Sequence, residues 1–493
     1  MKNPYLFFLP ILWLLIYSTA IGQGNMIVPP GTKVTIGHGT TLDIGGSKLL
    51  LMDDFNNAPS FLEYGALSFS NGGKAYVEQY LTKDIWHMVS SPVNFAYNEV
   101  YLWHYMGEFD EPSGTWDDIN LPLTIPLNTG QGYFAFNYSV DPNGQWPVSP
   151  DSVVFDGMLN DQDINVTLFN TDASPTSGWN LLGNPFPVAL EWNGDAAWNL
   201  NNVQATMYLF NASTGSYETW NFNSGGTNPN GGFIAATQAF WVRTADTVGN
   251  PASLTIPASQ RSHNNAAFLK SSGPVHPEQL FLTMERNGKA DKTIIGFMEE
   301  ATGGYDTEFD GVYRKASGDV LSLYSVVSGT TYALNELPSI KEYPMVSLHF
   351  IPSETGEYTL SATWTDSFKD DQPIYLEDTK TGIYYNLREQ SENNFYADIS
   401  DDTQRFMVHF KGMELTGNFD DLVKIYSHKR TVNVFVPQEM YGTLSMYDIA
   451  GKEVMAWPVQ PGTNTFQTQV KSGNYIVSFI ANEGTCTKKI NIQ

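Results

Sequence analysis

Residues 86–93 read WHMVSSPV and residues 179–186 read WNLLGNPF, and these two matching segments give the clearest indication of how the central chain is built. Each is a short, largely apolar stretch that starts with Trp and contains a Pro near its end. Because Pro has no backbone N–H to donate to a β-ladder, it ends a strand. We therefore interpret each segment as a buried strand followed by a turn, and the two segments as copies of one β module.

The residues that follow repeat the same landmarks in the same order. An aromatic stretch comes first, then a Trp after a Gly-containing turn, and finally a Gln followed by a small residue and aromatic residues. These landmarks are Val100–Trp103, Trp116 and Gln131–Phe136 in the first copy, and Met207–Phe210, Trp220 and Gln238–Val242 in the second. The order predicts an internal repeat over residues 83–257, either as a duplicated β module or as the two halves of one large sandwich.

Short apolar stretches separated by turn residues also fill the flanking parts. Residues 24–82 alternate small and β-branched residues with Gly turns, which indicates one or two coils of a β-helix-like layer, or a small meander, that caps the next domain. Residues 258–277 have the composition of a linker. Residues 278–412 contain about seven or eight strand-like stretches, as in an immunoglobulin-like or jelly-roll sandwich. Since no long helical periodicity occurs, we expect an all-β, multidomain chain of β-sandwiches with a short Gly-rich β unit at its N-terminus.

The first 22 residues have the pattern of a secretory signal peptide. Lys2 precedes an apolar run over residues 5–17, and small residues follow it. Ala20 and Gly22 suit the −3 and −1 positions, so we predict cleavage between Gly22 and Gln23. The apolar run is too short for a membrane-spanning helix, and we expect no membrane-spanning segment in the mature chain.

The cysteine content and the charge of the chain exclude some kinds of site and argue against some kinds of partner. The only cysteine is Cys486, so the chain cannot form an intramolecular disulfide or a clustered cysteine metal site. Its formal net charge is −26, but residues 424–493 carry seven basic and four acidic side chains, a net of +3, whereas residues 23–423 carry −30. An acidic body argues against nucleic acid and anionic lipid as partners. The change of sign predicts a domain boundary near Lys424.

The terminal segment, residues 424–493, alternates apolar and polar residues in short runs, which predicts a small antiparallel sandwich. Residues 413–423 would link it to the body. Its notable residues are Tyr447 and Asp448 before a turn, Gly451 and Lys452 in the turn, Gly473 and Tyr475 in the next long run, and Lys489 near the end.

This terminal segment resembles the type A C-terminal sorting domain of the type IX secretion system of Bacteroidota. The resemblance rests on four pieces in order: IYS at 425–427, YDIAGKEV at 447–454, GNYIVSF at 473–479 and the terminal KKINI. The Asn-Pro pair with which the family often opens is absent, and Lys452 stands where Arg is usual. The resemblance implies that the type IX machinery is a partner, and that it carries the chain from the periplasm across the outer membrane to the cell surface or the extracellular medium.

The sequence contains no recognisable catalytic or metal motif. It lacks HExxH, the G-x-S-x-G elbow and a phosphate-binding Gly-rich loop. Carboxylates such as Glu108 and Asp118 lie near aromatic residues, as in glycosidases, but such neighbours are frequent in so acidic a chain. The loop Tyr305–Gly311 offers oxygen ligands of the kind that Ca²⁺ takes, without the EF-hand spacing. We interpret it as a solvated loop and expect no cofactor, with Ca²⁺ as the open alternative.

Aromatic residues beside Asn and Asp are the best candidates for ligand contact. Exposed rings can stack on sugar faces while the polar side chains bond to hydroxyls. Our candidate contacts are Trp103, Trp116, Trp192 and Trp220, with burial in the core of the repeat as the alternative. We expect a non-enzymatic exported protein whose body is adhesive or contacts an extracellular or surface polysaccharide. A secreted polysaccharide hydrolase and a purely structural surface or matrix protein are the alternatives.

Overall fold

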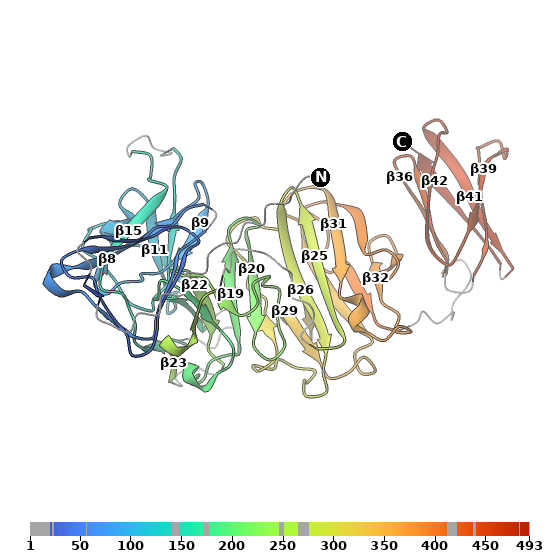
Figure 1. Cartoon of the computed structure of the whole chain (residues 1–493). Helices are drawn as coiled ribbons and strands as arrows, with labels where there is room; N and C mark the ends of the chain where they lie inside the picture. The colour runs from blue at the N-terminus through green and yellow to red at the C-terminus, as the bar shows by residue number, and fades with distance from the viewer. Residues whose placement is uncertain are drawn as a thin grey trace, which may run out of the picture. The chain divides into compact units, whose positions relative to one another are not determined.

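The computed structural model of the chain describes residues 20–21, 24–55, 57–140, 147–171, 177–245, 251–264, 276–411, 422–436, 440–482 and 484–492. Apart from 3₁₀ turns of three or four residues, the named elements in these ranges are strands, β1 to β42 (Figure 1), so the fold class is all-β as predicted. No helix in the described ranges is long and apolar enough to cross a membrane. The chain divides into two compact units, Met1–Val275 with Asp306–Gly311, and His276–Tyr305 with Val312–Gln493.

The first unit begins with a two-coil β-helix. Its elements are β1 (Ala20–Ile21), β2 (Met26–Val28), β3 (Lys33–Ile36), β4 (Thr41–Asp43), β5 (Lys48–Leu51), β6 (Ser60–Glu63), β7 (Ala66–Ser68), η1 (Ser70–Gly72) and β8 (Lys74–Tyr80). β2, β5 and β8 stack in parallel, as do β3 and β6, and β1, β4 and β7. This parallel pairing is that of a β-helix-like layer and not of a meander. The coils approach closely at one turn, where a Cβ on Gly73 would collide with the carbonyl oxygen of Gly45.

The last strand of the coils joins them to the repeat. β8 pairs antiparallel with β15 (Ser152–Gly157), so the sheet β15-β8-β5-β2 contains strands of both parts. One hydrophobic core extends from Val28 and Phe61 in the coils to Tyr133 and Phe155. A β-helix of two turns buries too little surface to stand alone, and here it shares a core with its neighbour.

The two halves of the repeat have the same order of elements. The first half contains β9 (Trp86–Val89), β10 (Ala96–Tyr97), η2 (Asn98–Tyr101), β11 (Tyr105–Asp110), β12 (Thr115–Asp118), β13 (Pro126–Leu127), β14 (Tyr133–Phe136) and β15. After β16 (Ile164–Leu168), the second half contains β17 (Trp179–Gly183), β18 (Ala189–Glu191), η3 (Ala196–Trp198), β19 (Thr206–Asn211), β20 (Ser216–Asn221), β21 (Phe233–Ile234), β22 (Ala239–Arg243) and β23 (Ala252–Ile256). Each half forms an antiparallel sheet in the same order, β12-β11-β14-β9 and β20-β19-β22-β17. One landmark is misaligned in the sequence, because Val100–Trp103 lies in and after η2, and the strand that corresponds to Met207–Phe210 is β11.

Reciprocal contacts join the two halves. Val89 bridges to Gln238, and Leu182 bridges to Gln131. Val89 and Leu182 hold the same place in the two Trp segments, and the two Gln residues hold the same place in theirs, so the bridges are related by a pseudo-two-fold axis. A Cβ on Gly132 would lie 2.6 Å from the carbonyl oxygen of Leu182. This close approach explains why a small residue follows each Gln.

The first unit continues into the predicted linker. Residues 258–264 are folded and contain η4 (Ala258–Gln260) and β24 (Arg261–Ser262), which pairs with β18. Arg261 forms a buried ion pair with Glu63 of β6. The His263 ring bonds to the Ser60 hydroxyl at 2.7 Å. The polar side chains that suggested a linker are thus bonded to the β-helix instead of water.

The second unit contains one continuous sheet of eleven strands, more than the seven or eight strand-like stretches that the sequence suggested. The strands are β25 (Gln279–Arg286), β26 (Lys289–Phe297), β27 (Gly311–Val312), β28 (Ser322–Val327), β29 (Thr330–Leu337), β30 (Met345–Ile351), β31 (Gly356–Thr363), β32 (Tyr375–Asp378), β33 (Ile383–Asn386), β34 (Glu392–Ala397) and β35 (Phe406–His409), with η5 (Thr365–Ser367) after β31. Their order is β33-β32-β35-β30-β28-β29-β26-β25-β31-β34, with β27 on β29. Figure 1 shows β26, β25 and β31 side by side. Residues from both ends of this order, such as Ala397 and Ile383, share one core, so the sheet curls over itself into two layers.

The terminal segment forms a small antiparallel sandwich with its own core. Its strands are β36 (Lys424–His428), β37 (Thr431–Val436), β38 (Gly442–Tyr447), β39 (Glu453–Val459), β40 (Gly462–Gln467), β41 (Gly473–Ala481) and β42 (Gly484–Ile492). They form the sheets β36-β37-β40 and β39-β38-β41-β42. Val434 and Phe479 meet in the core, which also buries Val423. The sandwich therefore includes the end of the predicted linker 413–423, most of which lies outside the described residues.

Candidate functional site

One face of the first repeat sheet carries a row of aromatic side chains. Trp86 on β9 lies opposite Phe136 on β14, which lies opposite Tyr105 on β11. The Trp86 ring centroid is 4.8 Å from that of Phe136 and 6.0 Å from that of Tyr105. Because side chains alternate along a strand, the neighbouring Tyr133 and Ala135 point the other way and enter the core. We call Trp86, Phe136 and Tyr105 the aromatic row.

The Phe134 ring packs against two members of the aromatic row, Trp86 and Tyr105. The buried ring lies 4.8 Å from Trp86, edge to face, and 5.7 Å from Tyr105, stacked. Gly107 makes room for it, since a Cβ there would collide with the Phe134 ring. Such ring pairs contribute about 0.5–1.5 kcal/mol each beyond their buried area. The row is therefore held in place although Trp86 remains 40% exposed.

A pocket of about 420 Å³ lies at the Tyr105 end of the row, and we call it the Trp103 pocket. Ligand sites usually have volumes of about 300–1,000 Å³. Trp103, Tyr105 and Tyr138 supply its aromatic walls, and Trp103 is 38% exposed. The other lining residues are Asn98, Tyr101, Leu102, His104, Met106, Asp118, Ile119, Asn120, Leu121, Leu123 and Pro147.

The backbone around Trp103 is held in an unusual conformation. Trp103 has a φ of +76°, in the left-handed region that bulky residues rarely adopt. The buried Ser149 hydroxyl donates to the Trp103 carbonyl oxygen at 2.5 Å and accepts from the Tyr138 amide at 3.2 Å. His104 Nε2 donates to the carbonyl oxygen of Pro150 at 3.2 Å. Residues 149–150 thus fix two walls of the pocket from behind.

The described lining of the Trp103 pocket has many polar side chains but carries negative charge. Asp118 is the one carboxylate in the described lining, and no Lys or Arg is part of it. Its Oδ1 accepts from the Asn120 amide at 2.9 Å, and Asn120 Oδ1 accepts from the Met106 amide at 2.7 Å. Burial raises the pKa of Tyr105, with smaller contributions from the nearby Asp118 and Tyr138. Burial also lowers the pKa of His104, so its imidazole is neutral at neutral pH.

The structure separates the four Trp residues that the sequence suggested as ligand contacts. Trp103 lines the pocket. Trp116 is partly buried between the halves of the repeat, with its ring 4.4 Å from Phe134 and 5.7 Å from Trp241. Trp192 is 1% exposed and its Nε1 donates to the Ala205 carbonyl oxygen at 2.7 Å. This burial removes Trp192 as a ligand contact, because a side chain closed off from solvent cannot reach a bound sugar.

Trp220 also belongs to the packing of the second half. It packs against the hydrophobic core of that half, and a Cβ on Gly232 would lie 2.8 Å from its Nε1. For Trp116, Trp192 and Trp220 the structure favours the core alternative over ligand contact.

A second cavity in the first unit is lined by four acidic residues of the first half of the repeat. Its volume is about 550 Å³, and its acidic lining residues are Glu108, Asp110, Glu111 and Asp117. Glu111 is buried and accepts from the Gly178 amide at 2.8 Å and the Thr171 hydroxyl at 3.0 Å. Glu108 accepts from Gln131 Nε2 at 2.9 Å. The bonds of Glu111 tie the first half to residues beside β17, and the bond of Glu108 holds Gln131 within the first half, so both carboxylates have a structural role.

The loop Tyr305–Gly311 is not the solvated loop that the sequence suggested. Its residues 306–311 belong to the first unit, where the Thr206 hydroxyl donates to the Asp310 carbonyl oxygen at 2.7 Å. Asp310 is buried, and its carboxylate accepts from the Asp306 amide at 2.8 Å. Among the described residues, no group of three or more His, Cys, Asp or Glu side chains is placed to hold a metal ion.

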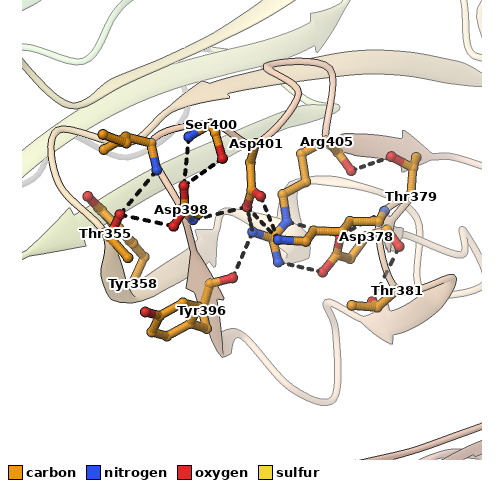
Figure 2. A network of polar contacts seen from close by, with 12 residues as sticks. Thr355, Tyr358, Asp378, Thr379, Thr381, Tyr396, Asp398, Ser400, Asp401 and Arg405 are labelled. Carbon is orange, nitrogen blue, oxygen red and sulfur yellow. Dashed lines mark hydrogen bonds and ion pairs between the residues drawn. The ribbon is translucent and has the colours of Figure 1, made fainter.

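A buried ion network lies in the second unit. Figure 2 shows Arg405 between Asp378 and Asp401. The guanidinium bonds to both oxygens of Asp378, at 2.9 and 3.1 Å, to Asp401 at 3.1 Å and to the Tyr396 carbonyl oxygen at 2.9 Å. Lys380 bonds to Asp401 from the outer side at 2.6 Å.

The charged side chains of this network bond to one another and to the backbone. Arg405 and Lys380 balance the charges of Asp378 and Asp401, and Asp398 accepts from the Ser400 amide and hydroxyl. We therefore interpret the network as a clamp between β32, β34 and β35 and not as a ligand site.

The structure explains why the residues named for the sorting-domain resemblance occur at their positions in the terminal sandwich. Tyr447 ends β38, and the Asp448 carboxylate then accepts from the amides of Ala450 and Lys452 at 2.9 and 3.0 Å. Gly451 has a φ of +80°, which favours glycine. The motif thus encodes a tight turn closed by Asp.

The remaining motif residues define the last two strands. Gly473 begins β41, and the Tyr475 hydroxyl donates to the Lys471 carbonyl oxygen at 2.7 Å. Lys489 is exposed on β42 opposite Ile476. These contacts account for the residues structurally, and the sorting role stays a prediction.

The predicted signal-peptide cut lies outside the described residues. Gly22 and Gln23 are not among them, while β1 precedes the cut and pairs with β4. Cleavage there would remove β1 and leave β4 paired with β7 alone.

Sequence reasoning did not single out Trp86, Tyr105, Phe136 and Tyr138 as site residues. A signal was present, because aromatic residues recur at positions 134, 136 and 138 with the period of a strand. Only the register of β9, β14 and β11 places Trp86 and Tyr105 on the same face.

Comparison with known proteins places the chain in a family. No curated protein matches the chain. A family model described as a domain of unknown function, DUF8693, matches residues 87–410. The match begins within β9 and ends just after β35, so it spans the repeat and the eleven-stranded sheet and leaves out the β-helix and the terminal sandwich. The chain belongs to the DUF8693 family.

Proposed function

We propose that the chain is an exported surface or extracellular protein whose first unit binds carbohydrate at the aromatic row and the Trp103 pocket. The observation that carries this proposal is the continuity of the two features, because Tyr105 belongs to both. Trp86 and Trp103 keep large parts of their rings exposed although the surrounding rings pack tightly.

The chemistry of the site suits a sugar polymer. Sugar rings have apolar C–H faces that stack on aromatic rings, and hydroxyl groups that need hydrogen-bond partners. The aromatic row supplies the rings, and the Trp103 pocket adds Asp118 and the Tyr105 hydroxyl. Among the described residues of the pocket lining Asp118 is the one carboxylate, whereas glycoside hydrolysis uses a pair of acids. The proposal is therefore a binding module and not a hydrolase.

Binding is tested with the full chain lacking its first 22 residues. Soluble and insoluble polysaccharides are screened by affinity electrophoresis and pull-down, with Trp86→Ala and Trp103→Ala variants beside the unmodified chain. We expect each variant to weaken binding about tenfold, which corresponds to about 1.4 kcal/mol. Tyr441→Ala is the matched control, because Tyr441 is 64% exposed in the terminal sandwich, outside this site.

The outcomes separate the proposal from its alternatives. Binding that survives both Trp substitutions would show that this face is not the site. Turnover of a polysaccharide by the unmodified chain would favour the hydrolase alternative. Absence of binding across the panel would leave the structural surface protein as the better description.

Export rests on the signal peptide and on the resemblance of residues 424–493 to a sorting domain. The separate core of the terminal sandwich supports its treatment as a removable domain. We expect a chain truncated at Asn418 to accumulate in the periplasm, as measured by fractionation and protease accessibility of intact cells. Unchanged surface display of the truncated chain would contradict the sorting role.

A further inference from the structure

The Trp103 pocket combines aromatic walls with negative charge. Trp103, Tyr105 and Tyr138 line it together with Asp118, and the lining described contains no Lys or Arg. The faces of aromatic rings carry negative electrostatic potential and attract cations, and a neighbouring carboxylate adds to this attraction. A neutral sugar can donate a hydroxyl to the carboxylate, whereas a protonated amine gains the attraction between opposite charges as well.

The position of Asp118 supports the attraction of a cation to the Trp103 pocket. Its Oδ1 is engaged by the Asn120 amide, which fixes the direction of the carboxylate. Asp118 lies opposite Gly107 in the pairing of β12 with β11, and Tyr105 is two residues from Gly107 on β11, so the two side chains lie on the same face of the sheet. The lowered pKa of His104 means that the imidazole adds no positive charge to the lining at neutral pH. The net charge of −26 favours a cationic ligand over an anionic one.

We propose that the Trp103 pocket binds the ammonium group of an amino sugar, so that the ligand of the first unit is a polysaccharide with free amines. This inference rests on the proposed carbohydrate function and specifies its substrate class. The aromatic row would contact the sugar rings of the chain, while the Trp103 pocket would take one protonated amine between its rings and Asp118.

The test compares two oligosaccharides of equal length, one of glucosamine and one of N-acetylglucosamine. Acetylation removes the positive charge and leaves the sugar ring unchanged. Calorimetric titration of the full chain without its first 22 residues is done at slightly acidic pH, where the amines are protonated. We expect the glucosamine oligomer to bind about tenfold more tightly, which corresponds to about 1.4 kcal/mol, because its ammonium group gains the cation–π contact and the attraction of Asp118.

Asp118→Asn is the decisive variant. Asn keeps an oxygen that can accept from the Asn120 amide, so the local turn is preserved while the charge is lost. We expect this variant to bind the two oligomers with equal affinity. Asp117→Asn is the matched control, because Asp117 is the preceding exposed acid on β12 and does not line the Trp103 pocket. It should keep the full preference. Thermal unfolding of both variants checks that the fold is intact.

The results distinguish this inference from the proposed function. Equal binding of both oligomers by the unmodified chain, or a preference that survives Asp118→Asn, overturns the ammonium site. If Trp86→Ala then still weakens both oligomers, the carbohydrate site stands. Binding of neither oligomer also overturns the ammonium site, and the polysaccharide panel decides the proposed function separately.

Discussion

Replacing Asp291 by Asn tests whether one buried acid sets the pH dependence of the second unit. Asp291 lies on β26 and is buried. Its carboxylate accepts from the Tyr313 hydroxyl at 2.7 Å and from the Leu323 amide at 2.8 Å. Burial outweighs these bonds and raises the pKa of Asp291 from 3.8 to about 7.

The direction of the effect follows from the proton balance. Between a pH of about 4 and a pH of about 7, the native state holds a proton on Asp291 that the unfolded chain has lost. The free energy of unfolding therefore falls as the pH rises through this range. The stability that the extra proton on Asp291 gives to the native state is fully present below about pH 4 and is lost by about pH 7. A difference of about three pKa units corresponds to about 4 kcal/mol.

The measurement follows the second unit specifically, because a chain with several cores need not unfold in one step. Urea unfolding is monitored by brief proteolysis and mass spectrometry of peptides from β26 and β28, at several pH values in this range. The stability difference between the unmodified chain and Asp291→Asn should shrink or change sign as the pH rises. Asp319→Asn, which alters an exposed acid of the same unit, should show no such trend. A difference between the unmodified chain and Asp291→Asn that stays constant with pH would refute the reasoning.

Three further substitutions probe other parts of the fold. Arg405→Met should destabilise the second unit by about 3–5 kcal/mol in urea unfolding, because it leaves Asp378 buried without its partner. Gly107→Val should lower the melting temperature of the first unit, with a cost of about 1–3 kcal/mol, because the new side chain collides with Phe134. Ser149→Ala should weaken sugar binding several-fold while costing about 1 kcal/mol of stability, as measured by titration and thermal unfolding, because the wall of the pocket loses its support.

The repeated sheet could be predicted because its signals are local. The Trp segments and the Pro residues that end them follow from the chemistry of strands. The terminal sandwich was predictable for the same reason, since apolar alternation and the Asp448–Gly451 turn need no distant partner.

The aromatic row, the Trp103 pocket and the ion network of Arg405 could not be predicted from local sequence, because they depend on pairing between distant segments. Trp86 and Tyr105 reach one face through the register of three strands. Trp192 and Trp103 look alike in sequence, and only the packing shows that one is buried and the other exposed. Residues 306–311 appeared to be a charged surface loop, because their hydrogen-bond partners lie about 100 positions earlier in the chain.

The paired bridges between the halves of the repeat have a consequence for assembly. Each half contributes one Trp-segment residue and one Gln-segment residue, as Val89 with Gln238 and Leu182 with Gln131 show. This is the arrangement of a symmetric dimer interface, in which one patch serves both partners. Here a covalent connection joins the partners, so association is intramolecular and the local concentration of one half around the other is on the order of millimolar. Joining of the two halves is therefore independent of how much protein is present.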